Sequence, residues 1–232
     1  MSVKVEPQEL RFQATGRSGE VSALLLRPEN ASALLVFAHG AGAGMRHAFM
    51  EAAAHRLARE GIATFRYQFP YMEQRSGRPD AQPILLATVR SAIERARELA
   101  PDLPLIAGGK SMGGRMTSNA AAESPLPGVL GLVFFGFPLH APGKQGVERG
   151  DHLARVTVPM LFLQGTRDAF ADLALLRPLC DALGDRSTVH VVDGADHSFH
   201  VPKRSGRDDA AVLDELVDTC AKWAGDLDRS KT

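Results

Sequence analysis

The feature that most constrains this chain is the stretch at residues 103–118, LPLIAGGKSMGGRMTS, in which an apolar run leads directly into a serine between glycines. Residues 105–107 predict a buried strand, and the residues from Met112 onward favour a helix. Residues 109–113 have the pattern Gly-x-Ser-x-Gly, whose glycines permit a strained turn and the close approach of neighbouring chain. The stretch therefore predicts a strand, a sharp turn that carries Ser111, and a helix.

The same residues resemble the end of a phosphate-binding P-loop, because Gly109 is followed by Lys110 and Ser111. That motif requires a glycine five residues before its last glycine, and Pro104 occupies this position. The glycine-rich loop whose backbone N–H groups hold phosphate cannot form around a proline there. We therefore expect no nucleotide site at this turn.

Length, composition and charge limit the class of protein. The 232 residues, 44% of them hydrophobic, suffice for one large core, so we expect a single domain over residues 1–232, with residues 228–232 as a frayed tail. The 27 Lys and Arg residues balance 27 Asp and Glu residues, which favours neither nucleic acid nor an anionic membrane as a partner.

Residues 1–10 lack the apolar core of a signal peptide, and no segment has the length of a membrane-spanning helix. We expect a cytoplasmic protein in which Cys180 and Cys220 are reduced core thiols.

Apolar runs alternate with helical patterns along the chain. Strands are predicted at residues 10–14, 21–26, 33–38, 62–67, 105–107, 129–135, 159–164 and 188–192. Helices are predicted at residues 45–61, 83–100, 112–123, 171–183 and 208–223, and loops at residues 68–82 and 136–150. The first two strands flank a polar turn and indicate an antiparallel pair. The later alternation predicts an α/β fold with an eight-stranded, mostly parallel sheet and helices on both faces.

Two further strand ends carry the side chains that a reactive serine needs. A serine hydroxyl attacks a carbonyl only with a base within hydrogen-bond reach and a third group that orients the base. In a parallel sheet covered on both faces, reactive groups gather at the carboxyl ends of the strands. Asp168 follows the strand at residues 159–164, and His197 follows the strand at residues 188–192. The order Ser111, Asp168, His197 is that of a serine, acid and histidine triad.

Five motifs carry a closer resemblance to a known family: HGAGAG at residues 39–44, GGKSMGGR at 108–115, FPLHAPGK at 137–144, LFLQGTRD at 161–168 and DHSF at 196–199. With them the chain resembles an α/β-hydrolase over nearly its whole length. It is similar in particular to the small dienelactone-hydrolase-like branch, including the testis-expressed hydrolase-like proteins and the hydrolase-like subunit of a chromatin-modifying complex. The resemblance implies Ser111 as nucleophile, Asp168 as orienting acid and His197 as general base.

Backbone donors and aromatic side chains complete the predicted site. One oxyanion donor should be the N–H of Met112, which follows the serine at the amino end of a helix. The other should come from the loop after residues 33–38, where we favour Ala41 over Gly42. Four aromatic residues just past strand ends are expected to line a substrate pocket: Phe69, Tyr71, Phe137 and Phe199.

Several assignments have alternatives in the sequence. Asp168 precedes a predicted helix and could cap its amino end, in which case Asp172 is the substitute acid. Asp196 cannot act as an imidazole base, and His200 lies further than His197 from the strand end. Lys110, beside the serine, is either a solvated neighbour or a charge that favours an anionic substrate.

Histidines elsewhere give no sign of a metal site. His197 and His200 have a spacing that a metal site could use, but no Cys, His or carboxylate cluster with ligand spacing accompanies them. We expect neither a metal nor an organic cofactor. His39 is expected to bond the backbone of its loop.

These observations predict a serine hydrolase that acts on a small ester, thioester or related acyl substrate through an acyl-serine intermediate. The segment between residues 135 and 159 is too short for a separate cap domain, which disfavours lipase-type interfacial activation. The alternatives are a catalytically weak or inactive hydrolase-fold module that acts in protein–protein interaction, and a peptidase. The expected partner is a small-molecule acyl substrate, and the sequence does not determine the oligomeric state.

Overall fold

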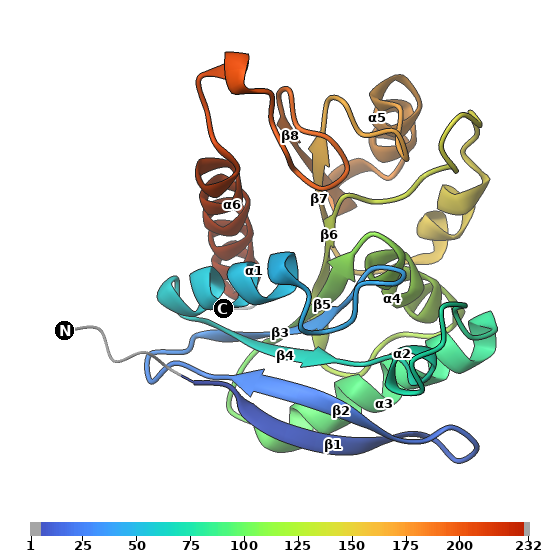
Figure 1. Ribbon diagram of the computed structural model, residues 1–232, viewed down its shortest axis with the longest axis vertical. Coiled ribbons are helices and arrows are strands. Elements are labelled where there is room, and N and C mark those ends of the chain that lie inside the picture. The colour runs from blue at the N-terminus through green and yellow to red at the C-terminus, as the bar shows by residue number, and fades with distance from the viewer. Residues whose placement is uncertain (1–5, 230–232) are drawn as a thin grey trace.

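A computed structural model describes residues 6–229 of the chain, and Figure 1 shows its arrangement. The strands are β1 (Gln8–Thr15), β2 (Gly19–Leu26), β3 (Ala33–Ala38), β4 (Ile62–Tyr67), β5 (Leu105–Lys110), β6 (Val129–Phe135), β7 (Met160–Gly165) and β8 (Ser187–Val192). They form one sheet in the order β1-β2-β4-β3-β5-β6-β7-β8. The pairs β1–β2 and β2–β4 are antiparallel, and the pairs from β4 to β8 are parallel. The predicted eight-stranded, mostly parallel sheet is confirmed.

Helices cover both faces of this sheet. The α-helices are α1 (Ala48–Arg59), α2 (Pro70–Glu73), α3 (Gln82–Leu99), α4 (Met112–Glu123), α5 (Leu173–Ala182) and α6 (Asp209–Arg229). Short 3-10 helices are η1 (Glu148–Arg155), η2 (Gly184–Arg186) and η3 (Lys203–Ser205). One core lies beneath α1 and α6, which contact each other and whose axes cross in Figure 1, and the other lies beneath α3, α4 and α5. None of the helices within residues 6–229 is long and apolar enough to span a bilayer.

Strand β3 shows why both cores form. All of its residues are buried, since successive side chains point to opposite faces and each face is covered. Leu34 and Val36 belong to the core beneath α3 and α4, whereas Leu35 and Phe37 belong to the core beneath α1 and α6. The apolar run at residues 33–38 is thus explained by burial on both sides of the sheet.

The structure differs from the sequence prediction mainly in the loops. Residues 68–82 contain α2, which is too short to give a periodic signal, and the loop predicted at residues 136–150 runs into η1. Helix α1 begins at Ala48, after His47, whose side chain accepts a hydrogen bond from the Phe49 N–H. Helix α6 continues beyond the predicted end at residue 223 to Arg229. Residues 230–232 of the predicted tail lie outside the described residues.

The amino end of α4 packs against the end of β3, and this contact fixes the turn between β5 and α4. A Cβ atom on Gly113 would lie 2.5 Å from the carbonyl oxygens of both Ala38 and His39. These oxygens belong to backbone at the sheet centre, so they cannot move aside without displacing β3. Glycine is therefore required at this position.

We expect Gly113→Ala to lower the free energy of unfolding by about 3 kcal/mol, because the added methyl group overpacks a rigid contact. Gly225→Ala is the matched control, since a Cβ atom at Gly225 in α6 meets no atom within 4 Å. The control should be neutral or stabilising by about 0.5–1 kcal/mol, the helix-propensity difference between the two residues. Urea unfolding of both variants measures this. Equal stabilities would mean that α4 does not approach β3 as closely as described.

Candidate active site

Ser111 lies at the turn between β5 and α4 in a conformation that few non-glycine residues adopt. Its backbone angles are φ 52° and ψ −118°. The turn is held in place because the Ser111 N–H donates to the Phe135 carbonyl oxygen at 3.2 Å and α4 begins at the next residue. Strain of this kind costs about 1–3 kcal/mol and persists only where the surroundings enforce it. The turn places the Ser111 hydroxyl at the carboxyl edge of the sheet.

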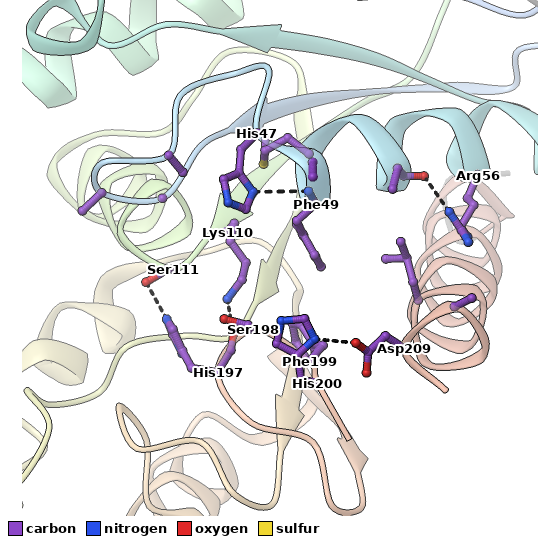
Figure 2. A pocket seen from close by; sticks show the side chains of 18 of the residues that line it. His47, Phe49, Arg56, Lys110, Ser111, His197, Ser198, Phe199, His200 and Asp209 are labelled. Carbon is purple, nitrogen blue, oxygen red and sulfur yellow. Dashed lines mark hydrogen bonds and ion pairs between the residues drawn. The ribbon is translucent and has the colours of Figure 1, made fainter. Parts of the chain in front are cut away.

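The structure brings Ser111, Asp168 and His197 together at this edge. His197 Nε2 lies 2.8 Å from Ser111 Oγ, and His197 Nδ1 lies 2.7 Å from Asp168 Oδ2. An ionised carboxylate only accepts hydrogen bonds, so Nδ1 carries the imidazole proton and Nε2 accepts from the Ser111 hydroxyl. Figure 2 shows the His197 ring pointing toward Ser111.

Asp168 is fixed by groups on its own strand and turn. Its side chain is almost fully buried, at 1% exposure. Its Oδ2 also accepts from Gln164 Nε2 at 2.5 Å, and its Oδ1 accepts from the Phe170 N–H at 2.7 Å. Gln164 Oε1 in turn accepts from the Phe137 N–H at 3.0 Å, which sets the orientation of the amide. The carboxylate therefore meets His197 in a defined position.

The alternative acid and base have other partners. Asp172 caps α5, where its Oδ1 accepts from the Ala174 N–H at 2.8 Å. Asp196 Oδ1 accepts from the backbone N–H groups of Ser198 and His200. The His200 ring pairs with Asp209 on α6 at 2.5 Å. The sequence left open that Asp168 caps the following helix. In the structure Asp172 caps this helix, α5, and Asp168 does not.

Two backbone N–H groups near Ser111 are available as donors. Among the described residues, neither the Met112 N–H nor the Ala41 N–H donates a hydrogen bond. The Gly42 N–H instead donates to Tyr71 Oη at 3.2 Å. This geometry favours Ala41 over Gly42 as the second oxyanion donor, together with Met112.

A cavity of about 700 Å³ opens beside Ser111 and His197. Figure 2 shows Ser111 and His197 at one end and Arg56 at the other. The loop after β3 and the segments that carry Phe170 and Phe199 contribute walls near the serine, and α1 and α6 contribute the remainder. This volume is typical of small-molecule sites.

Comparison with known proteins places this fold and site in a family. Residues 31–225 match the model of a family described as an alpha/beta hydrolase domain. The chain belongs to the α/β hydrolase family. The matched segment contains Ser111, Asp168 and His197, and it also contains Ala41 and Met112.

Solved structures of α/β hydrolases share this architecture. A dienelactone hydrolase from Anabaena variabilis is 21% identical with a TM-score of 0.72, over 94% of this chain and 97% of that one. A serine hydrolase without a lid from Xanthomonas campestris is 20% identical with a TM-score of 0.72, over 94% and 95% of the two chains. A serine hydrolase homologue from Coxiella burnetii is 18% identical with a TM-score of 0.73, over 93% and 98%. At these identities the structures establish the fold alone.

The predicted resemblance to α/β hydrolases, dienelactone hydrolase among them, is confirmed by these comparisons. The absence of a separate cap domain also agrees with the prediction, since the segment between β6 and β7 holds only η1 and short loops within the described residues. The closer likeness to the testis-expressed proteins and to the chromatin-complex subunit stays a prediction.

The structure corrects the prediction for three of the four aromatic residues. Phe199 lines the cavity, but Phe69, Tyr71 and Phe137 do not, and each of these three is at most 1% exposed. Phe69 packs edge-on against His39 with ring centroids 5.0 Å apart, and Phe137 packs between rings of β6 and β7. The chain turns inward after these strand ends, so the rings fill the core.

Other cavity residues have weak signals in the sequence. The Phe170 ring lies 4.3 Å from the His197 ring, although Phe170 follows Asp168 in a segment with no periodic pattern. Phe49 fits the predicted inner stripe of its helix, yet it lies in the first turn of α1 and lines the cavity. Gln164, which orients Asp168 from outside the cavity, has a clearer signal. A polar residue at the end of an apolar strand could have been identified as a partner of the active-site side chains.

His39 is a buried residue of the loop after β3. Its Nδ1 donates to the Gly40 carbonyl oxygen at 2.7 Å, and its Nε2 accepts from the Phe69 N–H at 3.1 Å. Burial lowers the pKa of this imidazole to about 4, so the ring is neutral at pH 7. These bonds agree with the structural role expected for His39.

Lys110 places a cation in the wall of the cavity next to Ser111. Its ammonium group donates to the His197 carbonyl oxygen, and it lies 5.7 Å from the Phe49 ring centroid and 5.2 Å from that of Phe199. Burial lowers the pKa of Lys110 to about 8, although the nearby carboxylates of Asp168 and Asp196 act in the opposite direction. The ammonium thus connects the turn at Ser111 with the loop that carries His197.

A second contact between a serine and a histidine lies in the core of this hydrolase. Ser118 Oγ lies 2.7 Å from His152 Nε2, and both residues are buried. Burial first, and then the charges of Arg115 and Arg155, lower the pKa of His152 to about 4. Neither Ser118 nor His152 lines the cavity beside Ser111. We interpret this pair as a core contact.

Proposed function

We propose that this chain is a serine hydrolase that cleaves a small ester, thioester or related acyl substrate through an acyl-serine intermediate. The observation that carries the proposal is the hydrogen-bonded series from Asp168 through His197 to Ser111 at the wall of a cavity. Ser111 is the nucleophile, His197 the general base and Asp168 the group that orients the imidazole. Membership of the α/β hydrolase family supports this assignment.

Acylation uses the geometry of the free site. His197 Nε2 takes the proton of the Ser111 hydroxyl as its oxygen attacks the substrate carbonyl carbon. The N–H groups of Met112 and Ala41 donate to the oxyanion of the tetrahedral intermediate. His197 then gives the proton to the leaving group, and the acyl group remains on Ser111. Asp168 accepts from the Nδ1–H throughout and stabilises the imidazolium that forms.

Deacylation repeats these steps with water. After the leaving group departs, His197 Nε2 takes a proton from a water molecule, whose oxygen attacks the acyl carbonyl carbon. Collapse of the second tetrahedral intermediate breaks the bond to Ser111 Oγ, which recovers its proton from His197. The carboxylic acid product then leaves the cavity.

We also propose that residues 1–232 form a single cytoplasmic domain whose partner is a small-molecule acyl substrate. The balance of 27 basic and 27 acidic residues supports a partner other than nucleic acid or a membrane surface. A site without a cap domain supports substrates that enter directly from solution.

Two reagents test the proposed function on the wild-type protein. We expect the protein to hydrolyse p-nitrophenyl acetate and to be labelled covalently by a fluorophosphonate probe. Prior treatment with a serine-directed inhibitor should abolish both reactions. A folded protein that neither hydrolyses the ester nor reacts with the probe would favour the alternative of a non-catalytic interaction module.

Lys110→Met is expected to reduce turnover and to change how stability depends on pH. The variant keeps an unbranched apolar stem but removes the donor to the His197 carbonyl oxygen, and we expect kcat to fall about tenfold, the effect of one hydrogen bond to a charged group. The pKa of Lys110 falls from 10.5 to about 8 on folding, so the protonated side chain disfavours the folded state. The stability of the variant relative to wild type should therefore be up to about 3 kcal/mol more favourable below pH 8 than above pH 10.5.

The stability difference should shrink as the pH rises from about 8 to 10.5, because Lys110 is then neutral in the folded protein and wild type no longer carries the penalty. Urea unfolding at pH 7 and pH 10 measures the change, and Lys144→Met, at an exposed position, is the control. A Lys110→Met variant that is equally destabilised at both pH values would show that the ammonium contributes only an ordinary structural contact.

A further inference from the structure

The cavity beside Ser111 continues as a groove between two helices that are distant in sequence. Helix α1 contributes Ala48, Phe49, Met50 and Ala52 to its lining, and α6 contributes Ala210 and Leu213. The two helices pack against each other, and an ion pair between Arg56 and Asp214 joins them at 2.6 Å. The groove is therefore a fixed part of the fold.

The middle of this groove is apolar. The Phe49 and Phe199 rings stack with centroids 5.9 Å apart and an interplanar angle of 18°, and Phe199 is only 3% exposed. Beyond the rings, the alanines at positions 52 and 210 leave space that larger side chains would fill. An apolar group that enters this space is removed from water on several sides.

The charged side chains at the outer end of the groove are already paired. Arg56 Nε donates to Asp214 Oδ1, and the His200 ring bonds Asp209 Oδ2. Figure 2 shows the His200–Asp209 pair, and it shows Arg56 at the end of the cavity away from Ser111. Each of these groups already has a protein partner, which does not favour this end of the groove as a site for a charged end of the substrate. The occupant that matches the groove is an uncharged hydrocarbon chain.

We propose that the substrate is an ester with an unbranched hydrocarbon chain of medium length, which lies between α1 and α6 while its carbonyl group faces Ser111. This inference rests on the proposed function and narrows its substrate class. Each buried methylene group strengthens binding, which corresponds to about a fourfold gain in kcat/KM per carbon. The chain can belong to the acyl or to the alcohol part of the ester, since both meet at the carbonyl group.

Two ester series test this inference with wild-type protein. One series is p-nitrophenyl acetate, butyrate, hexanoate and octanoate, and the other runs from ethyl acetate to octyl acetate. We expect kcat/KM to rise in at least one series, by about a hundredfold or more between its ends. A flat or falling response in both series, from protein that hydrolyses p-nitrophenyl acetate, would overturn the inference.

A variant pair tests the location of the chain. Ala210→Phe fills the groove and should remove most of the gain in kcat/KM between the short and long ester. Ala211→Phe is the matched control, because Ala211 is exposed on the same helix and does not line the cavity. It should keep the full gain. An equal gain in the two variants would exclude the groove as the binding site for the chain.

A binding measurement separates this inference from the proposed function. Ser111→Ala is titrated calorimetrically with methyl octanoate and with methyl acetate, and neither titration requires catalysis. We expect binding at least about a hundredfold tighter for the longer ester. If the two esters bound to Ser111→Ala with indistinguishable affinity, the groove would be excluded as the binding site for the chain, even if the wild-type protein were an active enzyme. If methyl octanoate bound tightly but the wild-type protein had no esterase activity, only the proposed function would be overturned.

Discussion

Ser111→Ala is expected to lower kcat for p-nitrophenyl acetate by about six orders of magnitude, to the limit of detection. The variant removes the attacking oxygen, and the remaining oxyanion donors cannot replace a nucleophile. The fold should be retained, because alanine keeps the same Cβ atom at φ 52° and Ser111 Oγ contributes one hydrogen bond, to His197. Steady-state kinetics and circular dichroism of the purified variant measure both properties.

Ser118→Ala provides a matched control, since Ser118 also contacts a histidine. We expect this variant to lose about 1 kcal/mol of stability with the buried hydrogen bond to His152, and to keep its turnover. If Ser118→Ala abolished hydrolysis while Ser111→Ala left it intact, the reactive serine would lie in the core pair.

Asp168→Asn is expected to lower turnover by about four orders of magnitude. The carboxylate accepts from His197, Gln164 and the Phe170 N–H, so both of its oxygens act as acceptors. An asparagine amide must turn its NH₂ group toward at least one of these donors. If that group faces His197, the imidazole carries its proton on Nε2 and can no longer accept from Ser111. If it faces Phe170, a buried N–H loses its acceptor, and the fold is destabilised by about 1–3 kcal/mol.

Asp172→Asn is the matched control for the acid. Asparagine caps a helix as well as aspartate does, so α5 should keep its amino end and the enzyme its turnover. Kinetics and urea unfolding of the two variants distinguish the candidates. A loss below about tenfold for Asp168→Asn, with a large loss for Asp172→Asn, would transfer the orienting role to Asp172.

Much of the sheet can be predicted from the sequence because its strands are buried on both faces. The predicted strands at residues 33–38, 62–67 and 129–135 match β3, β4 and β6 to the residue. At 33–38 and 129–135 the signal is a continuous apolar run, which is typical of a strand buried on both faces. The positions of Asp168 and His197 follow from the same logic. Parallel strands bring their carboxyl ends to one edge, so residues just past those ends meet.

The substrate cavity could not be predicted in the same way. Phe69 and Phe199 both follow strand ends, yet only Phe199 reaches the cavity, because tertiary packing decides whether the chain turns inward. The groove forms between α1 and α6, which lie far apart in sequence, so no local pattern marks it. The contact from Lys110 to the His197 carbonyl oxygen likewise depends on how two distant loops meet.

The most direct test of the central claim is mass spectrometry of the protein after reaction with a fluorophosphonate probe, with the modified residue located by peptide fragmentation. We predict a single adduct on Ser111 in wild type, and none in Ser111→Ala, because among the serines of residues 6–229 only Ser111 contacts a histidine in the cavity wall, at 2.8 Å. A folded wild-type protein with no adduct, or with its adduct on another residue such as Ser118, would contradict the account.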